Sequence, residues 1–332
     1  MGKHTIGEAF AVAPRELRRV RGQREEKVRG EIQLRLPFKT PFDAKGMLHF
    51  LGTRAVAGVE TFDGETYRRT LRLPHGAGMV ALSDGGDYVL CVLRLENLRD
   101  LDAAVQRCRW LLDLDADPVA VADALGAGPL LGDLVRSSPG RRVPGSTDGA
   151  ELAFRAVLGQ QISVAGARTL AGRLVARCGE PLPETLAAGG DEPTHLFPGP
   201  HAVAEAAHRD LGVSTARRQS LRALARTLAD GGISLDPGAE REEVERRLLE
   251  LRGIGPWTAS YVAMRALRNP DAFLPTDLGV RRAILRLGHA DDRQSVAALA
   301  ESWRPWRAYA TQHLWASLGD ERDQTKKREV VA

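Results

Sequence analysis

The feature of this sequence that most restricts its fold is a pair of helical stretches separated by two glycines and a proline, between residues 241 and 268. In the first stretch, apolar residues recur at the three- and four-residue spacing of one helix face, at Val244, Leu248 and Leu251. Gly253 and Gly255 then interrupt this spacing. Pro256 suits the first turn of a second helix, because the amide that proline lacks would have no partner there. The pattern predicts two helices joined by a hairpin at residues 248–258.

A hairpin of this kind offers a binding place for an anion. Its glycines allow the backbone to come close to another molecule, and the unpaired N–H groups that begin the second helix favour negative charge. A DNA phosphate fits this description. The alternative is an ordinary helical hairpin in which Gly253 and Gly255 only end the helices, and the two glycines by themselves leave both interpretations open.

The rest of the chain divides into a strand-rich first part and a helical second part. From residue 31 to about residue 95, the stretches EIQLRLPF, TYRRTLRLP and YVLCVLRL alternate apolar and polar residues, which predicts strands, and residues 42–56 between them indicate a helix. Beyond residue 98 the spacing is helical almost to the end. We therefore expect an α+β fold in which a small sheet domain precedes an all-α body.

Composition sets broad limits on the class of protein. The chain has 332 residues, 43% of them hydrophobic, which is enough for two or three packed domains. No run approaches the roughly 18 apolar residues of a membrane span, and residues 1–30 are densely charged rather than signal-like, so we expect a cytoplasmic protein with no membrane partner. The net charge of +4 leans toward a polyanionic partner without establishing one.

Longer strings in the sequence resemble a known family. LRGIGPWTASY followed by FLPTDLGV is similar to the hairpin and catalytic loop of the helix-hairpin-helix (HhH-GPD) DNA glycosylases. The segments at residues 42–60, 144–163 and 302–315 are similar to AlkA-type 3-methyladenine DNA glycosylases. The resemblance covers roughly residues 36–318. It implies a glycosylase II type hydrolase that removes alkylated purines from damaged double-stranded DNA in base excision repair.

The resemblance also implies a domain plan. It predicts an antiparallel α+β domain of the TATA-binding-protein type followed by a helical glycosylase body made of two subdomains, with the active cleft between them. The expected segments are a flexible extension at 1–30, the sheet domain at 31–115, the glycosylase domain at 116–318 and a flexible tail at 319–332. We expect a monomer associated with the nucleoid.

The candidate catalytic residue is Asp277. It stands between the apolar residues FLP and a helical stretch, so its local pattern is that of a helix N-cap, and the upstream hairpin favours a catalytic role beside that cap. Breaking an N-glycosidic bond develops positive charge on the deoxyribose, and a fixed carboxylate beside C1′ stabilises this charge while it orients water. An alkylated purine such as N3-methyladenine is already cationic, so no separate general acid is required.

Two other chemistries of the superfamily are not expected here. Members that also cleave the DNA strand carry a lysine nucleophile near the end of the hairpin, where this chain has Trp257. Members with an iron-sulfur cluster use four closely spaced cysteines downstream, whereas the three cysteines here are Cys91, Cys108 and Cys178. We predict a monofunctional enzyme that leaves an abasic site and requires no cofactor.

Aromatic residues are the candidates for the base pocket, because their ring faces attract a cationic base. By resemblance these are Trp257, Tyr261 and Trp315, with Phe50 contributed by the first domain. Taken singly, Tyr261 and Phe50 are more typical of core aromatics, and it is together with Asp277 that the four aromatics favour a site. Trp303 and Trp306 are predicted to serve packing.

The residues expected to contact DNA lie in two turns. AVLGQQIS resembles the turn that fills the gap left by a flipped nucleotide, with Gln161 where AlkA has a leucine, and Gln160 fits either a DNA contact or a helix-terminal hydrogen bond. In the hairpin, the expected contacts are Gly253, Ile254, Gly255 and Thr258. The resemblance also implies a structural Na⁺ or K⁺ held by the main-chain carbonyls of Leu249, Leu251 and Ile254. Arg155, Arg168 and Arg281 are first candidates for phosphate contacts.

Three alternatives remain. The first is a non-catalytic protein that uses the hairpin only to hold DNA, and the second is a bifunctional glycosylase-lyase for oxidised bases. The third is fusion to an alkyl-transfer regulator, which we do not expect because the first 35 residues contain no cysteine that could accept a methyl group.

Overall fold

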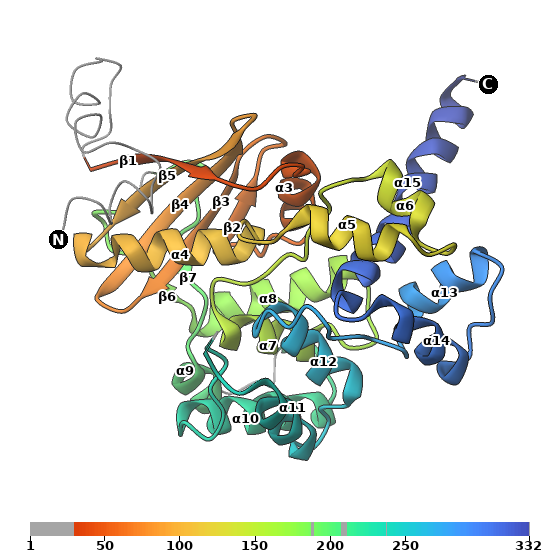
Figure 1. Ribbon diagram of the computed structural model, residues 1–332. Helices are drawn as coiled ribbons and strands as arrows, with labels where there is room; N and C mark the ends of the chain where they lie inside the picture. The colour runs from red at the N-terminus through yellow and green to blue at the C-terminus, as the bar shows by residue number, and fades with distance from the viewer. Residues whose placement is uncertain (1–29, 187–188, 207–210, 237, 332) are drawn as a thin grey trace.

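The computed structural model describes residues 30–186, 189–206, 211–236 and 238–331, with side chains up to residue 319. It begins with a sheet domain and continues as a helical body (Figure 1). This confirms the α+β class. The predicted extension at 1–30 lies, apart from Gly30, outside the described residues.

The sheet is antiparallel throughout, with strand order β1-β5-β4-β3-β2. Its strands are β1 (Ile32–Pro37), β2 (Glu60–Phe62), β3 (Tyr67–Leu73), β4 (Gly76–Asp84) and β5 (Tyr88–Leu95). The three predicted strands correspond to β1, β3 and β5. The central strand β4 was not predicted. Its sequence does not alternate apolar and polar residues, because both of its faces are covered: Val80 packs in one apolar cluster and Met79 in another.

Helices α3 (Ala44–Gly52) and α4 (Leu101–Leu112) cover one face of this sheet (Figure 1). The helix predicted at 42–56 is therefore α3, which begins after its N-cap Asp43. The other face is covered by the segment that carries the short strands β6 (Glu180–Pro181) and β7 (His195–Leu196). Residues 53–58, which follow α3, leave the sheet domain and reach the helical body, where Val56 joins its core.

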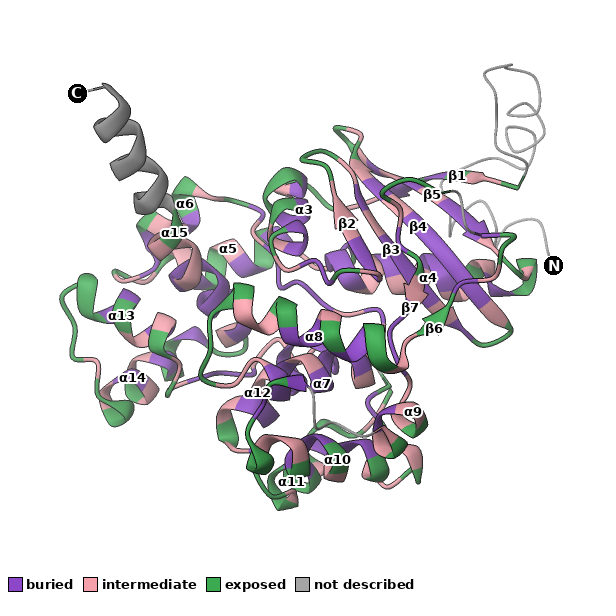
Figure 2. Cartoon of the chain, turned by 180° about the vertical axis from the view of Figure 1, so that it is seen from behind, coloured by how far each residue is buried: buried purple, intermediate pink, exposed green. Residues whose placement is uncertain are grey.

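The helical body is built around α7 (Gly149–Leu158), which is buried on nearly all sides (Figure 2). Its sequence AELAFRAVL has apolar residues around most of its circumference, as expected for a central helix. The surrounding helices are α5 (Pro118–Gly126), α6 (Gly132–Ser137), α8 (Val164–Cys178), α9 (Pro200–Glu205), α10 (Thr215–Ala229), α11 (Arg241–Glu250), α12 (Pro256–Arg265), α13 (Leu278–Arg286), α14 (Arg293–Ala300) and α15 (Arg307–Val331). The predicted tail at 319–332 is helical up to Val331.

A buried ion network joins the sheet domain to α7. Arg69 on β3 contacts Glu60 at 3.2 Å and Glu151 at 2.6 Å, and Arg155 contacts the same two carboxylates at 2.9 and 2.8 Å. Burial disfavours the charged form of Glu60, but the guanidinium groups of Arg155 and Arg69 outweigh this effect and hold the pKa of Glu60 below its usual value. The network therefore fixes strands β2 and β3 against α7.

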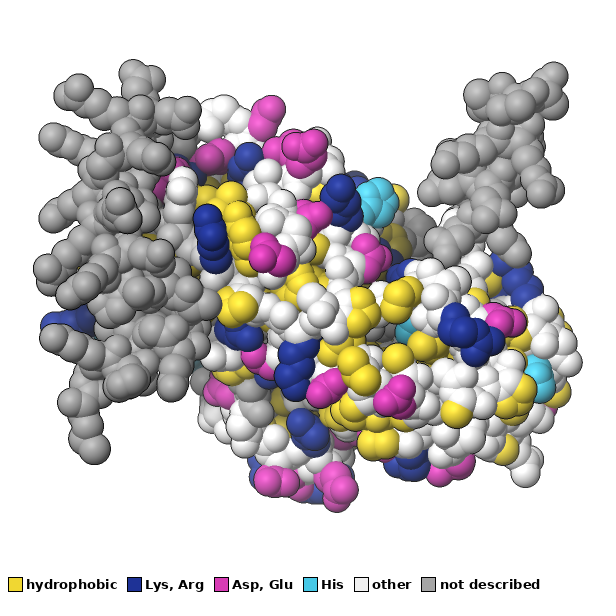
Figure 3. Space-filling view, turned by 45° about the horizontal axis from the view of Figure 1, so that its top comes forward, with side chains coloured by type: hydrophobic (Ala, Val, Ile, Leu, Met, Phe, Trp, Pro, Cys, Tyr) yellow, Lys and Arg dark blue, Asp and Glu magenta, His cyan; other side chains and the backbone are white. Residues whose placement is uncertain are grey.

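Charge on the surface is mixed. Figure 3 shows Lys and Arg side chains interspersed with Asp and Glu over the visible face. Among the described residues, no helix has the length and apolar character needed to cross a bilayer. A DNA-binding surface therefore has to be located from the site itself rather than from net charge.

Candidate active site

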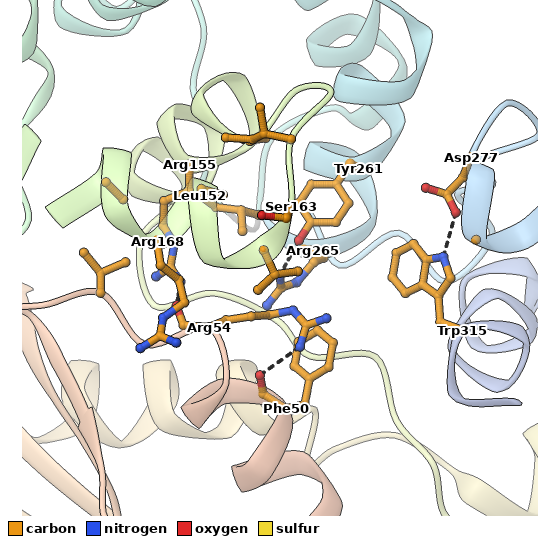
Figure 4. Close-up of a pocket in the computed structure, with 18 of the residues that line it drawn as sticks. Phe50, Arg54, Leu152, Arg155, Ser163, Arg168, Tyr261, Arg265, Asp277 and Trp315 are labelled. Carbon is orange, nitrogen blue, oxygen red and sulfur yellow. Dashed lines mark hydrogen bonds between the residues drawn. The ribbon is translucent and has the colours of Figure 1, made fainter. Parts of the chain in front are cut away.

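The carboxylate of Asp277 is held by three hydrogen bonds. As the N-cap of α13 it accepts the Val280 N–H on Oδ1 at 2.9 Å, which confirms the predicted capping role. Oδ1 also accepts the Trp315 indole N–H at 2.8 Å (Figure 4). Oδ2 accepts the Trp257 indole N–H at 2.8 Å. These donors fix the plane of a half-buried carboxylate without neutralising its charge.

The four predicted pocket aromatics line the same cavity as this carboxylate. Trp257 and Tyr261 lie one turn apart on α12 and stack with ring centroids 5.1 Å apart and planes 9° apart. Trp315 reaches in from α15 and Phe50 from α3. By contrast, Trp303 is buried with its ring edge against Phe273, in agreement with a packing role.

Asp277 and these aromatics line one cavity of about 420 Å³, at the junction of α3, α7, α8, α12 and α13. This volume falls in the range of sites for small organic ligands. The lining is mostly apolar on the side of α8 and aromatic on the side of α12. The cavity is thus large enough to hold a single extruded base beside the carboxylate.

The hairpin has the predicted form, with α11 and α12 joined by residues 251–255. Gly253 has a φ of +84°, and a Cβ there would lie 1.9 Å from the Ser220 hydroxyl oxygen. Gly255 is the N-cap of α12 and faces open space. Ile254 and Thr258 are buried, so their side chains support the turn, and any DNA contact from them would come from the backbone.

Comparison with known proteins identifies the family. The model of the AlkA N-terminal domain matches residues 33–148, and that of the HhH-GPD superfamily base excision DNA repair proteins matches residues 154–308. DNA-3-methyladenine glycosylase 2 of Escherichia coli is 33% identical over 295 residues, which cover 87% of this chain and 99% of that protein. This chain belongs to the AlkA family of the HhH-GPD superfamily.

Two further relatives define the extent of the match to the AlkA family. A protein of Mycobacterium tuberculosis described as a probable bifunctional transcriptional activator/DNA repair enzyme AlkA is 46% identical over 303 residues, 91% of this chain. The matched part is 60% of that longer protein. A 3-methyladenine DNA glycosylase from Archaeoglobus fulgidus has the same fold, with a TM-score of 0.73 at 24% identity over 85% of this chain and 97% of that one.

The second predicted DNA-contact turn lies between α7 and α8, and its residues Gly159, Ile162 and Ser163 line the cavity. Gln161 is exposed at a φ of +57°, and the neighbouring Ile162 and Val164 are 38% and 46% exposed. Gln160 instead uses its amide internally, donating to the Gly253 carbonyl at 2.9 Å and to the Thr258 hydroxyl at 3.0 Å. Of its two predicted roles, the structure shows the internal hydrogen bond, which ties this turn to the hairpin.

The three arginines proposed for phosphate contacts are largely engaged within the protein. Arg155 belongs to the buried network, and Arg281 pairs with Asp291 at 3.0 Å. Arg168 donates from Nε to the Ala55 carbonyl at 2.8 Å while it lines the cavity. Arg155 thus neutralises buried carboxylates while it also lines the cavity, and a phosphate contact by any of the three arginines stays a prediction.

Sequence reasoning missed two other arginines of this AlkA-family pocket. Arg54 and Arg265 line the cavity beside Phe50 and Tyr261 (Figure 4). Each arginine stands four residues after one of these aromatics, and this spacing is the signal that could have identified them.

Proposed function

We propose that this chain is a monofunctional DNA glycosylase that excises alkylated purines such as 3-methyladenine from damaged double-stranded DNA. The observation that carries this proposal is the position of Asp277: a charged carboxylate, oriented by two indole N–H groups, on the wall of a base-sized cavity next to the hairpin. DNA as substrate would place the activity at the nucleoid.

In the proposed reaction the target nucleotide leaves the helix and its base enters the cavity. Extrusion costs a few kcal/mol, and this cost is smaller for a damaged pair. As the C1′–N bond breaks, its electron pair goes to the base and positive charge develops on the sugar. Asp277 stabilises that charge and orients a water molecule, whose oxygen bonds to C1′.

The hairpin supports this proposal because its backbone N–H groups are available to bind a DNA phosphate. Gly255 exposes the start of α12, where N–H groups without helical acceptors favour an anion. A Na⁺ or K⁺ at the turn would be held by the carbonyls of Leu249, Leu251 and Ile254. The Leu251 carbonyl accepts the Ile254 N–H at 3.0 Å and has a second lone pair, so the turn fits such an ion.

The decisive experiment is base release from duplexes that contain methylated purines, hypoxanthine or oxidised guanine, with the freed base measured by chromatography. We expect release of methylated purines by the wild type and a loss of at least about 100-fold in Asp277→Asn. DNA affinity should be retained in this variant. Exclusive release of oxidised guanine would overturn the proposal.

A matched control exists in the same chain. Asp292 is the N-cap of α14 and accepts the backbone N–H groups of Gln294 and Ser295, but it does not line the cavity. Asp292→Asn should therefore leave base release unchanged. If Asp277→Asn were equally active, the chain would be better described as a protein that binds DNA through its hairpin.

The monofunctional part of the proposal has its own test. A lyase forms a Schiff base between an amine and the sugar, which borohydride reduces to a stable protein–DNA adduct. With Trp257 at the position of the lysine, we expect no adduct. A trapped adduct would mean that another amine acts as nucleophile.

A further inference from the structure

Three guanidinium groups on the wall of the cavity have no carboxylate partner among the described residues. Arg168 donates to the Ala55 carbonyl, and Arg54 and Arg265 lie beside the aromatic rings of Phe50 and Tyr261. Arg265, only 7% exposed, donates to the carbonyls of Pro144 and Gly145 at 2.7 and 3.1 Å and to the Tyr261 hydroxyl at 2.5 Å. Arg54 donates to the Phe50 carbonyl at 3.2 Å and to the Thr53 hydroxyl at 3.1 Å. None of these acceptors is a carboxylate. The Tyr261 hydroxyl is the one ionisable group among them: burial raises its pKa, but Arg265 and Arg54 outweigh this effect and lower it.

A buried charge without a counter-ion is unfavourable. Burial lowers the pKa of Arg54 to about 10, and the nearby Arg265 and Arg155 add to this effect while Tyr261 opposes it. The adjacent Arg155 differs from Arg54 in this respect, because its charge is compensated by Glu60 and Glu151. Uncompensated charge in the cavity therefore suits a group that enters it and accepts hydrogen bonds or negative charge.

The two arginines also occupy ring faces that could otherwise meet a cationic base. The Arg54 guanidinium lies 3.7 Å from the centre of the Phe50 ring. Arg265 lies 5.4 Å from that ring centre and 5.5 Å from the centre of Tyr261, whose ring also stacks on Trp257. Figure 4 shows Arg54 and Arg265 side by side between these rings. This wall of the cavity is thus cationic rather than electron-rich.

We propose that Arg54 and Arg265 determine which leaving bases the pocket favours: they stabilise the departure of a neutral 6-oxopurine and oppose the binding of a cationic alkylpurine. The proposal rests on the glycosylase function proposed above and extends it to these two residues. It changes the expected role of this wall from attracting cations to accepting negative charge.

The chemistry follows from the charge of the leaving base. In either case the C1′–N9 bond breaks with its electron pair on the base, and water supplies oxygen to C1′. A cationic purine becomes neutral in this step, whereas a neutral purine becomes an anion until it takes up the proton that the water loses. A guanidinium group stays protonated and donates several hydrogen bonds, so it stabilises the anion without giving up a proton.

The test compares wild type with Arg54→Gln in single-turnover base release from two duplexes, one with hypoxanthine and one with N7-methylguanine. Arg54 is preferred to Arg265, because Arg265 also holds the backbone at Pro144 and Gly145. We expect hypoxanthine release to fall about 100-fold, as when one preorganised donor is removed, whereas methylguanine release should stay the same or rise, because a repulsive charge is lost. Arg54→Lys should recover part of the hypoxanthine activity.

Arg68→Gln is the matched control. Arg68 lies on β3, pairs with Asp63 at 2.6 Å and does not line the cavity, yet its replacement removes the same charge. Both rates should match wild type, with thermal melting curves confirming folded variants.

Each negative result has a separate meaning. Methylguanine release by the wild type without any hypoxanthine release, or equal losses for both duplexes in Arg54→Gln, would refute the role of the arginines and leave the proposed function intact. Release of neither base by the wild type would refute the proposed function itself.

Discussion

The indole N–H of Trp315 donates to Oδ1 of Asp277 at 2.8 Å. The tryptophan is therefore both a wall of the base cavity and a fixed support for the carboxylate. Trp257 donates to the other carboxylate oxygen at 2.8 Å. The two indole rings together therefore fix the orientation of the Asp277 carboxylate. The same rings thus form the cavity wall and orient the carboxylate for which we propose the catalytic role.

The first prediction separates these two roles. Trp315→Phe keeps an aromatic wall but removes the hydrogen bond to Asp277. Hydrogen bonds to charged groups contribute about 1.5–3 kcal/mol, so we expect single-turnover base release to fall by roughly 10- to 100-fold with little change in DNA affinity. Trp306→Phe, on a ring that packs against Tyr309 and does not line the cavity, should leave the rate unchanged. Equal rates for the two variants would show that the hydrogen bond has no catalytic role.

The second prediction concerns the two glycines of the hairpin. Gly253→Ala places a Cβ at 1.9 Å from the Ser220 hydroxyl and at a φ of +84°. The backbone strain alone is worth roughly 1–2 kcal/mol, so the free energy of unfolding should fall by at least that amount in denaturant titrations.

Gly255→Ala complements Gly253→Ala, because it tests DNA binding by the hairpin without straining the fold. Its Cβ would meet no atom of the chain, so stability should stay within about 0.5 kcal/mol of wild type. The new methyl group would, however, occupy the space in front of α12, and DNA affinity measured by fluorescence anisotropy should fall. Wild-type affinity in Gly255→Ala would argue against a phosphate at this helix end.

The third prediction addresses the exposed turn before α8. Gln161 has a φ of +57°, a conformation unfavourable for residues other than glycine by roughly 1–2 kcal/mol. Gln161→Gly should therefore be at least as stable as wild type in thermal melts. If this side chain fills the gap left by the flipped nucleotide, base release from duplex DNA should nevertheless decrease. Unchanged release would assign that role to another residue of the turn.

The fourth prediction is a pH dependence of stability from His313. Burial lowers the pKa of this imidazole to about 4, and the positive charge of Arg141 acts in the same direction while a hydrogen bond to the Leu134 backbone opposes them. An unfolded histidine has a pKa of about 6.5. Between these values the unfolded chain binds a proton that the folded chain does not, so the free energy of unfolding decreases as the pH falls from about 6.5 to about 4.

The size of this effect is roughly 3 kcal/mol, at 1.36 kcal/mol per pKa unit. Denaturant titrations at several pH values should show a shallower decline in His313→Gln than in wild type. His289→Gln, at an exposed position, should follow the wild-type curve. Parallel curves for His313→Gln and wild type would mean that other groups cause the acid sensitivity.

Much of the fold could be predicted because it depends on neighbours along the chain. The hairpin follows from Gly253, Gly255 and Pro256, whose backbone preferences act within a few residues. The capping role of Asp277 depends only on the amide of Val280, three residues away. The alternation of apolar and polar residues in β1, β3 and β5 could likewise be predicted, because successive side chains of a strand point to opposite faces of the sheet.

The sequence by itself also determined which residue types are available to the site. It places Asp277, Trp257 and Trp315 in motifs similar to those of the AlkA family, and no lysine stands where a lyase would need one. These properties do not depend on how the domains pack.

Only the tertiary structure decided how those groups are used. Whether an arginine faces a carboxylate, a carbonyl or a cavity depends on segments distant in the chain. Arg155 meets Glu60 across the domain junction, whereas Arg265 meets the backbone carbonyls of Pro144 and Gly145. The same holds for Gln160, whose amide binds Gly253. The physical reason is that burial and hydrogen-bond partners are set by packing between elements, and periodicity along one element carries no information about the element that packs against it.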